Sequence, residues 1–200
     1  MNDTVDKFEK LIANFYGAPY AVATDCCTHA IELCLRIENI EYPVNCPTRT
    51  YLSVPMTFMK LGLEWQFDDY DWENYYHIGC TSIIDAAVYW KPRGYVPGSK
   101  MCLSFQHKKH LSLGRGGMIL LDNYEEYAKL KKMSYDGRMP NTPWAEQDID
   151  TIGYHYYMTP ETAQTGIYRF CSAEVTEPRK WSSKDYPDLS KMKVFDAKQK

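Results

Sequence analysis

Residues 20–35 read YAVATDCCTHAIELCL, and their pattern changes from strand to helix in the middle. Tyr20–Thr24 is a short apolar run of the kind that forms a buried strand. After the polar turn 25–28, apolar side chains recur at the three- and four-residue spacing of a helix, at Ala30, Ile31, Cys34 and Leu35. We therefore predict a strand, a tight turn and a helix.

The rest of the chain continues this alternation. A helix is expected before the strand, because apolar residues recur at helical spacing and Gly17 follows, at Val5, Phe8, Leu11, Ile12 and Phe15. Further strands are expected at 43–46, 64–67, 82–85, 101–105 and 116–122, and a helix at 51–61. Asn123 and Thr159 are expected to cap two more helices. The alternation predicts a three-layer α/β/α fold with a mostly parallel sheet.

Length, charge and cysteine content narrow the class of protein. The chain has 200 residues, and one domain usually takes roughly 100–200. Its 23 basic and 26 acidic residues give a net charge of −3, which argues against binding to nucleic acid. No apolar run approaches the ~18–20 residues of a membrane span, and the polar start MNDTVDKFEK is unlike a targeting signal. The seven cysteines include no C-x-x-C pair, so we expect reduced thiols, no metal site and a cytoplasmic location.

Composition changes after residue 173. Residues 174–200 hold twelve charged residues and two prolines with weak periodicity, so we expect a C-terminal arm or tail that is partly ordered at best. Either it docks on a partner subunit or it is solvated, and both interpretations stay open. Residues 1–173 are expected to form the folded domain.

Two predicted strand ends carry residues that suggest chemistry. The turn 25–28 opens a helix whose free N–H groups and dipole favour an anion, with the Thr28 hydroxyl as a further donor. A structural helix cap is the alternative. Asp85 ends the strand 82–85, where the carboxyl ends of parallel strands line a ligand crevice. A carboxylate there favours a cation such as a protonated ring nitrogen, or else it caps the residues that follow.

Residues 104–117, SFQHKKHLSLGRGG, form a polar loop that ends in a glycine-rich turn. A lysine in a partly buried cleft can lose its proton and form a Schiff base with an aldehyde. A basic patch at 107–110 is the alternative, although an acidic chain gives it little support. The glycines precede a strand, so they are not a dinucleotide fingerprint. The aromatic stretch 153–160 is interpreted as core or interface.

Taken in order, these segments resemble the DegT/DnrJ/EryC1/StrS family of PLP-dependent sugar aminotransferases. Residues 20–31 resemble its strand and Ser-Gly-Thr-Ala-Ala-Leu phosphate turn, with Cys27 in place of the glycine. Residues 46–51 resemble its P-x-x-T-aromatic stretch, and 83–87 (IIDAA) its E-D-A-A motif. Residues 104–117 resemble its S-F-x-x-x-K-x…G-x-G-G signature. Residues 152–158 (IGYHYYM) resemble its G-Y-N-Y-R-M motif.

The resemblance assigns roles residue by residue. Lys109 matches the Schiff-base lysine of pyridoxal 5'-phosphate (PLP), and Asp85 matches the acid that pairs with the pyridine nitrogen; these two are the predicted catalytic residues. His155 stands where the family's Asn reaches the cofactor phosphate of the other subunit. The implied cofactor-binding set is Lys109, Asp85, Tyr51 (stacked on the ring), Cys27, Thr28 and Ser104 (around the phosphate) and His155. The fold implied is the large domain of the fold type I transferases.

The resemblance implies an aminotransferase that acts on a keto sugar nucleotide, with glutamate as amino donor, in a homodimer with a shared active site. Several departures from the family pattern motivate an alternative, a PLP-binding or vestigial protein without transaminase turnover. His155 and Tyr157 replace the Asn and Arg, and Val88 stands where a polar residue is common. A strand–helix segment is expected to be missing between Gly62 and Asp85, and the small C-terminal domain is expected to be absent. A dehydratase variant of the family has histidine in place of the lysine, and Lys109 argues against it.

Overall fold

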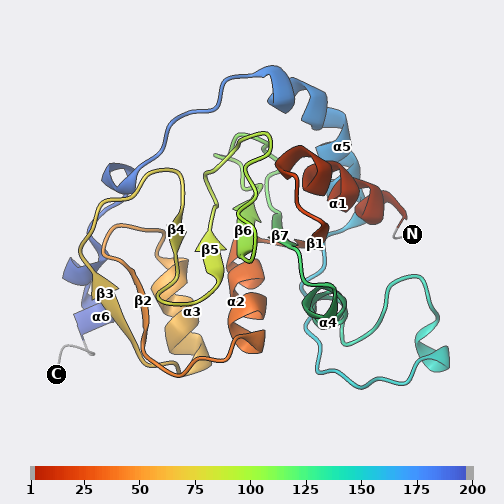
Figure 1. Cartoon of the computed structure of the whole chain (residues 1–200), viewed down its shortest axis with the longest axis horizontal. Helices are drawn as coiled ribbons and strands as arrows, with labels where there is room; N and C mark the ends of the chain where they lie inside the picture. The colour runs from red at the N-terminus through yellow and green to blue at the C-terminus, as the bar shows by residue number, and fades with distance from the viewer. Residues whose placement is uncertain (1–2, 197–200) are drawn as a thin grey trace.

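The structure, a computed structural model, describes residues 3–196 (Figure 1). The predicted strand, turn and helix are present as β1 (Tyr20–Thr24) and α2 (Cys27–Ile37), preceded by α1 (Asp3–Tyr16). The elements that follow α2 are β2 (Val44–Pro47), α3 (Ser53–Leu61), β3 (Trp65–Asp68), β4 (Tyr76–His77), β5 (Ile83–Asp85), β6 (Lys100–Ser104), β7 (Gly117–Leu121), α4 (Tyr124–Ser134) and α5 (Pro160–Val175). Apart from β4, each corresponds to a predicted element.

Five strands form the main sheet, in the order β1-β7-β6-β5-β4. The prediction of a mostly parallel sheet is wrong here, because β5 and β6 are its only parallel neighbours among the described strands. The connection between β6 and β7, residues 105–116, contains no helix. A strand that returns without a crossover runs antiparallel to the one before it. As a result β7 lies reversed between β1 and β6, while β1, β5 and β6 share one direction.

A second, smaller sheet pairs β2 with β3. These two strands are parallel, with Val44 opposite Trp65, and α3 connects them as a crossover helix. The β2–β3 pair is therefore a parallel crossover unit with a helix, whereas the parallel strands β5 and β6 are joined by residues 86–99 without a helix.

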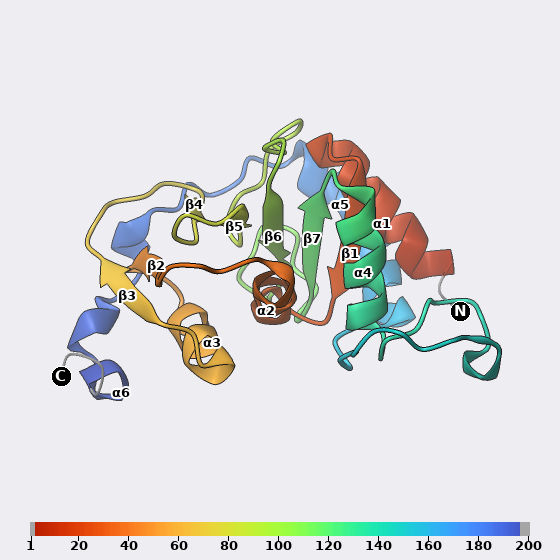
Figure 2. The same ribbon diagram turned by 60° about the horizontal axis from the view of Figure 1, so that its bottom comes forward.

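Helices cover both faces of the main sheet, which confirms the three-layer α/β/α architecture. Ala21 and Ala23 of β1 join the core beneath α1 and α5, whereas Val22 joins the core beneath α2 and α4. This division follows from the alternation of side chains along a strand. Figure 2 shows α1 and α5 side by side, and the two helices pack directly on each other.

Both predicted caps are confirmed. The side chain of Asn123 accepts a hydrogen bond from the backbone N–H of Glu126 at the start of α4. The side chain of Thr159 accepts one from the backbone N–H of Thr162 at the start of α5. Each cap satisfies a backbone donor that has no partner within the helix.

The C-terminal part of the chain is folded rather than solvated. The boundary predicted after residue 173 falls inside α5, and the following segment crosses from α5 to the β2–β3 pair (Figure 1). There it forms two 3-10 turns, Ser183–Asp185 and Leu189–Lys191, and the short helix α6 (Lys193–Asp196). Leu189 and Phe195 are buried. The solvated-tail interpretation is therefore wrong for residues 181–195, most of residues 176–180 are exposed, and residues 197–200 lie outside the described part of the chain.

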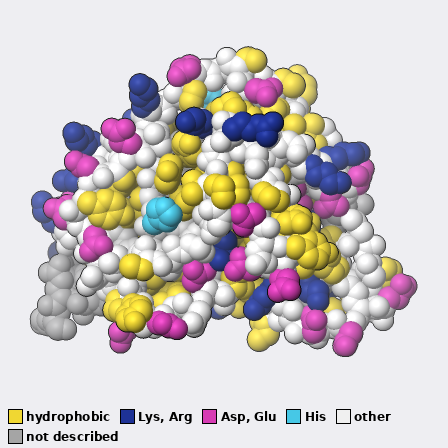
Figure 3. All heavy atoms as spheres, in the orientation of Figure 1, with side chains coloured by type: hydrophobic (Ala, Val, Ile, Leu, Met, Phe, Trp, Pro, Cys, Tyr) yellow, Lys and Arg dark blue, Asp and Glu magenta, His cyan; other side chains and the backbone are white. Residues whose placement is uncertain are grey.

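The surface charges and the helices of the described residues relate to the earlier expectations about nucleic-acid and membrane binding. Acidic and basic side chains both occur across the face shown in Figure 3. Within residues 3–196, no helix combines the length and the apolar character that crossing a membrane would require.

Candidate active site

A cavity of about 550 Å³ opens at the edge of the main sheet where β1, β5 and β6 end. Because these three strands run in the same direction, their carboxyl ends meet at one edge, as in other α/β ligand sites. Residues far apart in the sequence are brought together there. Six of the seven predicted site residues line the cavity: Cys27, Thr28, Tyr51, Asp85, Ser104 and Lys109.

Asp85 is the last residue of β5 and is 6% exposed. Burial raises the pKa of its carboxyl group, and two hydrogen bonds to the charged form oppose that rise. The Tyr76 hydroxyl donates to Oδ2 across 2.6 Å, and the backbone N–H of Ala87 donates to Oδ1 across 3.0 Å. These two donors orient the carboxylate at the cavity wall.

Tyr76 is itself held in place, and the sequence had not indicated a role for it. Its hydroxyl lies 2.5 Å from the hydroxyl of Thr50, and both residues are buried. Tyr76 belongs to β4, where it is the register partner of Asp85. The two-residue length of β4 explains why no periodicity in the sequence revealed it.

Lys109 lies on the loop between β6 and β7 and is half-buried. Its backbone N–H donates to the Gln106 carbonyl across 2.8 Å, which fixes the loop locally. Burial lowers the pKa of the Lys109 ammonium group, and attraction to the Asp85 carboxylate partly opposes this. The amine is therefore easier to deprotonate than an exposed lysine, as expected for a group that must act as a nucleophile.

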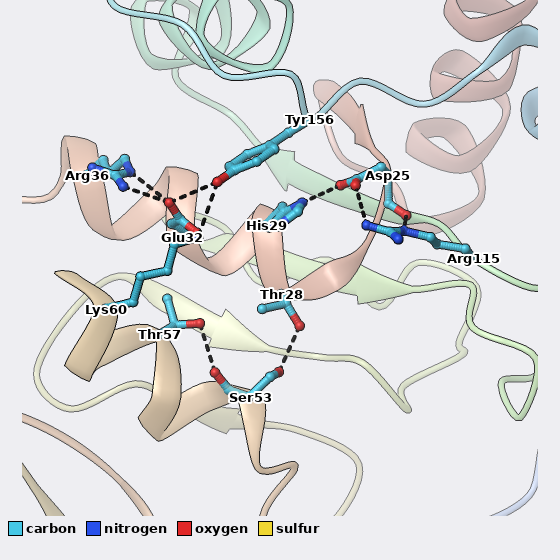
Figure 4. A network of polar contacts seen from close by, with 10 residues as sticks. All are labelled: Asp25, Thr28, His29, Glu32, Arg36, Ser53, Thr57, Lys60, Arg115 and Tyr156. Atoms are coloured by element: carbon cyan, nitrogen blue, oxygen red, sulfur yellow. Dashed lines mark hydrogen bonds and ion pairs between the residues drawn. The ribbon is translucent and has the colours of Figure 1, made fainter.

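The start of α2 forms another wall. Cys26 is the N-cap residue, and its side chain makes no capping hydrogen bond to the N-terminal donors of the helix. The Cys27 thiol points inward and donates to the Cys102 carbonyl at 3.5 Å. Thr28 and Ser53 place their hydroxyls 2.7 Å apart at the cavity (Figure 4). Ser104 adds a further hydroxyl at the end of β6.

The glycine-rich turn explains how β7 can approach this helix. A Cβ on Gly117 would lie 2.4 Å from the carbonyl carbon of Cys26 and 2.5 Å from the backbone nitrogen of Cys27. No side chain other than hydrogen fits there. The G-x-G-G pattern therefore allows the β7 strand to pack against the turn 25–28.

An ion-pair network surrounds the same turn (Figure 4). Asp25 accepts from His29 Nδ1 at 2.6 Å and from the Arg115 guanidinium at 2.6 Å. Burial alone would lower the pKa of His29, but hydrogen bonds and charges, above all Asp25, raise it to about 9. Asp25, Cys26 and His29 also place three potential metal-ligand atoms within 4.8 Å of one another. Sequence analysis had not singled out His29 or Arg115.

Tyr51 and His155 complete the predicted set, with different outcomes. Tyr51 precedes α3, lines the cavity and keeps 53% of its surface exposed, so its ring is accessible. His155 does not line the cavity. Its side chain is 73% exposed, and Nδ1 lies 3.1 Å from Oδ1 of Asp136. Within this chain, the structure therefore does not bring His155 to the site.

The fold and this donor set define a class, the fold type I PLP-dependent aminotransferases. A family model matches residues 1–91 and 91–182, and the chain belongs to the DegT/DnrJ/EryC1/StrS aminotransferase family. Members of this family and their solved structures are PLP-dependent aminotransferases, so PLP is the cofactor of the class.

Individual relatives are distant. The chain is 23% identical to the uncharacterized protein MJ1066 of Methanocaldococcus jannaschii, with 87% of this chain and 58% of the relative covered. It is 25% identical to the spore coat polysaccharide biosynthesis protein SpsC of Bacillus subtilis, with 82% and 56% covered. The chain thus spans somewhat more than half the length of these curated relatives.

Solved structures share the fold. AtS13 from Actinomadura melliaura superposes with a TM-score of 0.76 at 19% identity, covering 86% of this chain and 60% of the other. The sugar aminotransferase CalS13 from Micromonospora echinospora superposes with a TM-score of 0.70 at 15% identity, covering 86% and 61%. At these sequence identities, the structural similarity establishes that this chain shares the fold of these proteins.

Proposed function

We propose that this chain binds PLP through Lys109 and is a transaminase, or the cofactor-binding part of one, that acts on a keto sugar nucleotide. The observation that carries the proposal is that Lys109 and Asp85 line the same cavity and interact electrostatically. PLP carries its aldehyde and its ring nitrogen on different sides of one ring. Its binding therefore requires a cavity with a reactive amine for the aldehyde and an acid for the ring nitrogen.

The residues around the cavity fit the rest of the cofactor. Asp85, oriented by Tyr76, would hold the protonated ring nitrogen. The hydroxyls of Thr28 and Ser104 and the N-terminal N–H groups of α2 would hold the phosphate, because a helix start favours an anion. Tyr51 would stack on the ring.

PLP, when bound, supplies the electron sink for the chemistry. Lys109 would hold the cofactor through its Nζ, and the free amine would be placed to accept a proton from the Cα of an amino donor. The lowered pKa of Lys109 favours the neutral amine that both steps need. The Asp85 carboxylate would favour the protonated ring nitrogen of a bound cofactor, and loss of this carboxylate should raise the barrier by on the order of several kcal/mol.

Family membership supports the substrate class. Sugar aminotransferases occur among the structural neighbours, and the SpsC relative is described as a polysaccharide biosynthesis protein. We therefore include a keto sugar nucleotide as amino acceptor and glutamate as amino donor in the proposal. A cytoplasmic location also belongs to it, supported by seven cysteines that are all free.

A homodimer with a shared site completes the proposal. His155 is exposed and outside its own chain's cavity, as a residue that serves a second subunit would be. Sedimentation at high protein concentration tests this part: a dimer supports it, and a monomer at all concentrations contradicts it.

Titration of the purified protein with PLP tests the main proposal. We expect a visible absorption band, and borohydride should attach the cofactor permanently to the peptide that contains Lys109. Lys109→Ala should abolish the attachment, whereas Lys108→Ala, at the exposed neighbouring residue, should leave it unchanged. A colourless protein that takes up no PLP would contradict the proposal.

The second candidate is a PLP-binding protein without turnover, favoured by Tyr157 and His155 in place of the family's Arg and Asn. Glutamate separates the two candidates. Conversion of the bound cofactor to its amine form, seen as a shift of the absorption band, supports the transaminase. A bound cofactor that glutamate leaves unchanged supports the second candidate.

A further inference from the structure

The segment 176–196, called the C-terminal segment below, is attached to residues 71–74 by hydrogen bonds. The N–H of Asn74 donates to the Trp181 carbonyl at 3.1 Å, and the N–H of Ser183 donates to the Trp72 carbonyl at 3.0 Å. The Ser183 hydroxyl also bonds to Asp71. These bonds are made by Trp181 itself and by Ser183, two residues further on, and they fix the backbone from which the Trp181 side chain extends.

Trp181 reaches the predicted reactive amine. Nζ of Lys109 lies 5.4 Å from the centre of the Trp181 ring, and both residues line the cavity. The Arg179 guanidinium lies 4.0 Å from the centre of the same ring and pairs with Asp185. Two cations therefore contact one indole, and such contacts favour this position of the ring.

Four residues of the C-terminal segment line the cavity: Arg179, Trp181, Asp185 and Tyr186. The family model ends at residue 182, so it covers Arg179 and Trp181 but not Asp185 and Tyr186. Tyr186 packs on Trp72 with ring centres 5.5 Å apart, and its carbonyl accepts from Arg49. The cavity-lining residues of the C-terminal segment are thus held in place by contacts with residues of the main domain.

We propose that Trp181 is a specificity-determining residue that limits the size of the group next to the amino-bearing carbon of the substrate. The proposal rests on the proposed function, because it places the substrate's amino group at Nζ of Lys109. Any substituent on the adjacent carbon that extends toward the C-terminal segment meets the indole. An amino donor with a narrow acidic side chain should fit beside the indole, whereas an amino donor with an aromatic side chain should clash with it.

The test compares Trp181→Ala, Trp181→Leu and Trp181→Phe with the wild type and with Trp144→Phe, the control. Trp144 is 68% exposed and does not line the cavity. Each protein is loaded with PLP, and dissociation constants for glutamate and phenylalanine are measured from the change in cofactor absorbance. We expect the preference for glutamate over phenylalanine to fall at least about tenfold in the alanine and leucine variants. The preference of Trp181→Phe should lie between those of the wild type and Trp181→Ala, and the preference of the control, Trp144→Phe, should equal that of the wild type.

Tryptophan fluorescence gives a second readout that needs no amino acid. PLP should strongly quench the tryptophan fluorescence of the wild type, because Trp181 adjoins the site, and it should quench the fluorescence of Trp181→Phe less. The control, Trp144→Phe, should lose as much fluorescence on PLP binding as the wild type does. The proposal about Trp181 is overturned if the Trp181 variants bind PLP normally, keep the preference for glutamate over phenylalanine within twofold of the wild type and show unchanged quenching. The proposed function would still stand in that case. A wild type that takes up no PLP removes the proposed function and this inference with it.

Discussion

The Tyr76 hydroxyl donates a hydrogen bond to Oδ2 of Asp85 across 2.6 Å, between register partners on neighbouring antiparallel strands. The strand pairing thereby supplies the acid of the candidate site with a donor that no local sequence signal revealed. Because the bond favours the charged carboxylate, it opposes the rise in pKa that burial causes. Tyr76 therefore helps to keep Asp85 ionised.

Replacing Tyr76 by phenylalanine should weaken both the fold and the cofactor site. Thr50 and Asp85 would each lose a buried partner, which should cost about 1–3 kcal/mol of unfolding free energy. The pKa of Asp85 should rise further, and the affinity for PLP should fall. Urea unfolding and PLP titration measure the two effects. Tyr75→Phe, at a ring that contacts Tyr89, is the control; equal losses in both variants would argue against a specific role for the Tyr76 hydroxyl.

The ion pair between His29 and Asp25 should make stability depend on pH. The folded-state pKa of His29 is about 9, above its ordinary 6.5, so its contribution is fully present below pH 6.5 and is lost as the pH rises through 9. Asp25→Asn should remove this dependence and bring the pKa of His29 back toward 6.5. NMR titration of the histidine rings, with His29→Gln for assignment, checks the pKa. A wild type and an Asp25→Asn variant that lose stability in parallel between pH 6.5 and 9 would contradict the role of the pair.

Gly117→Ala should be strongly destabilising, because the new Cβ would meet the backbone of Cys26 and Cys27 at 2.4–2.6 Å. Backbone cannot yield as a flexible side chain does, so we expect a loss of at least about 2 kcal/mol and a weaker affinity for PLP. Gly114→Ala is the matched control: its φ is +83° and its surroundings are open, so only conformational strain of about 1 kcal/mol is expected. Thermal and urea unfolding of the two variants give the comparison, and similar losses would show that the close approach does not limit the site.

Leu189→Ala should show that the C-terminal segment is part of the cooperative fold. Leu189 is 1% exposed, and its N–H donates to the Thr48 carbonyl at 2.8 Å. Truncation of a side chain so buried should cost about 2–5 kcal/mol if the segment unfolds with the domain. Val194→Ala, at a residue 47% exposed, should cost far less. Hydrogen exchange that finds the segment unprotected in the wild type would contradict a cooperative role.

Local features were predictable where neighbouring residues carried them. The β1–α2 unit and the Asn123 and Thr159 caps depend on periodicity and on side chains a few residues apart, and all are present. The order of the motifs allowed six cavity-lining residues to be named. The mostly parallel sheet was mispredicted because the overall alternation of strands and helices was extended to the connection 105–116, where the sequence indicates a loop and β7 returns antiparallel.

The contributions of Tyr76 and Trp181 depend on contacts that span the chain. Trp181 is 72 positions from Lys109 in sequence (181 − 109), within a charged segment whose composition suggested solvent exposure. The composition of such a segment reflects its many exposed residues, whereas its position depends on a few contacts: the burial of Leu189 and Phe195 and the hydrogen bonds of Trp181 and Ser183.

The amino-acid sequence by itself indicated which chemical groups the candidate site offers: the amine of Lys109, the acid of Asp85 and a helix start beside the turn 25–28. It could do so because motifs and caps are short-range patterns. Only the tertiary structure decided that these groups share one hollow, that a tyrosine from β4 orients the acid, and that an indole from the C-terminal segment stands beside the amine. Those relationships arise from strand pairing and from burial between distant segments, and their energy depends on the three-dimensional arrangement.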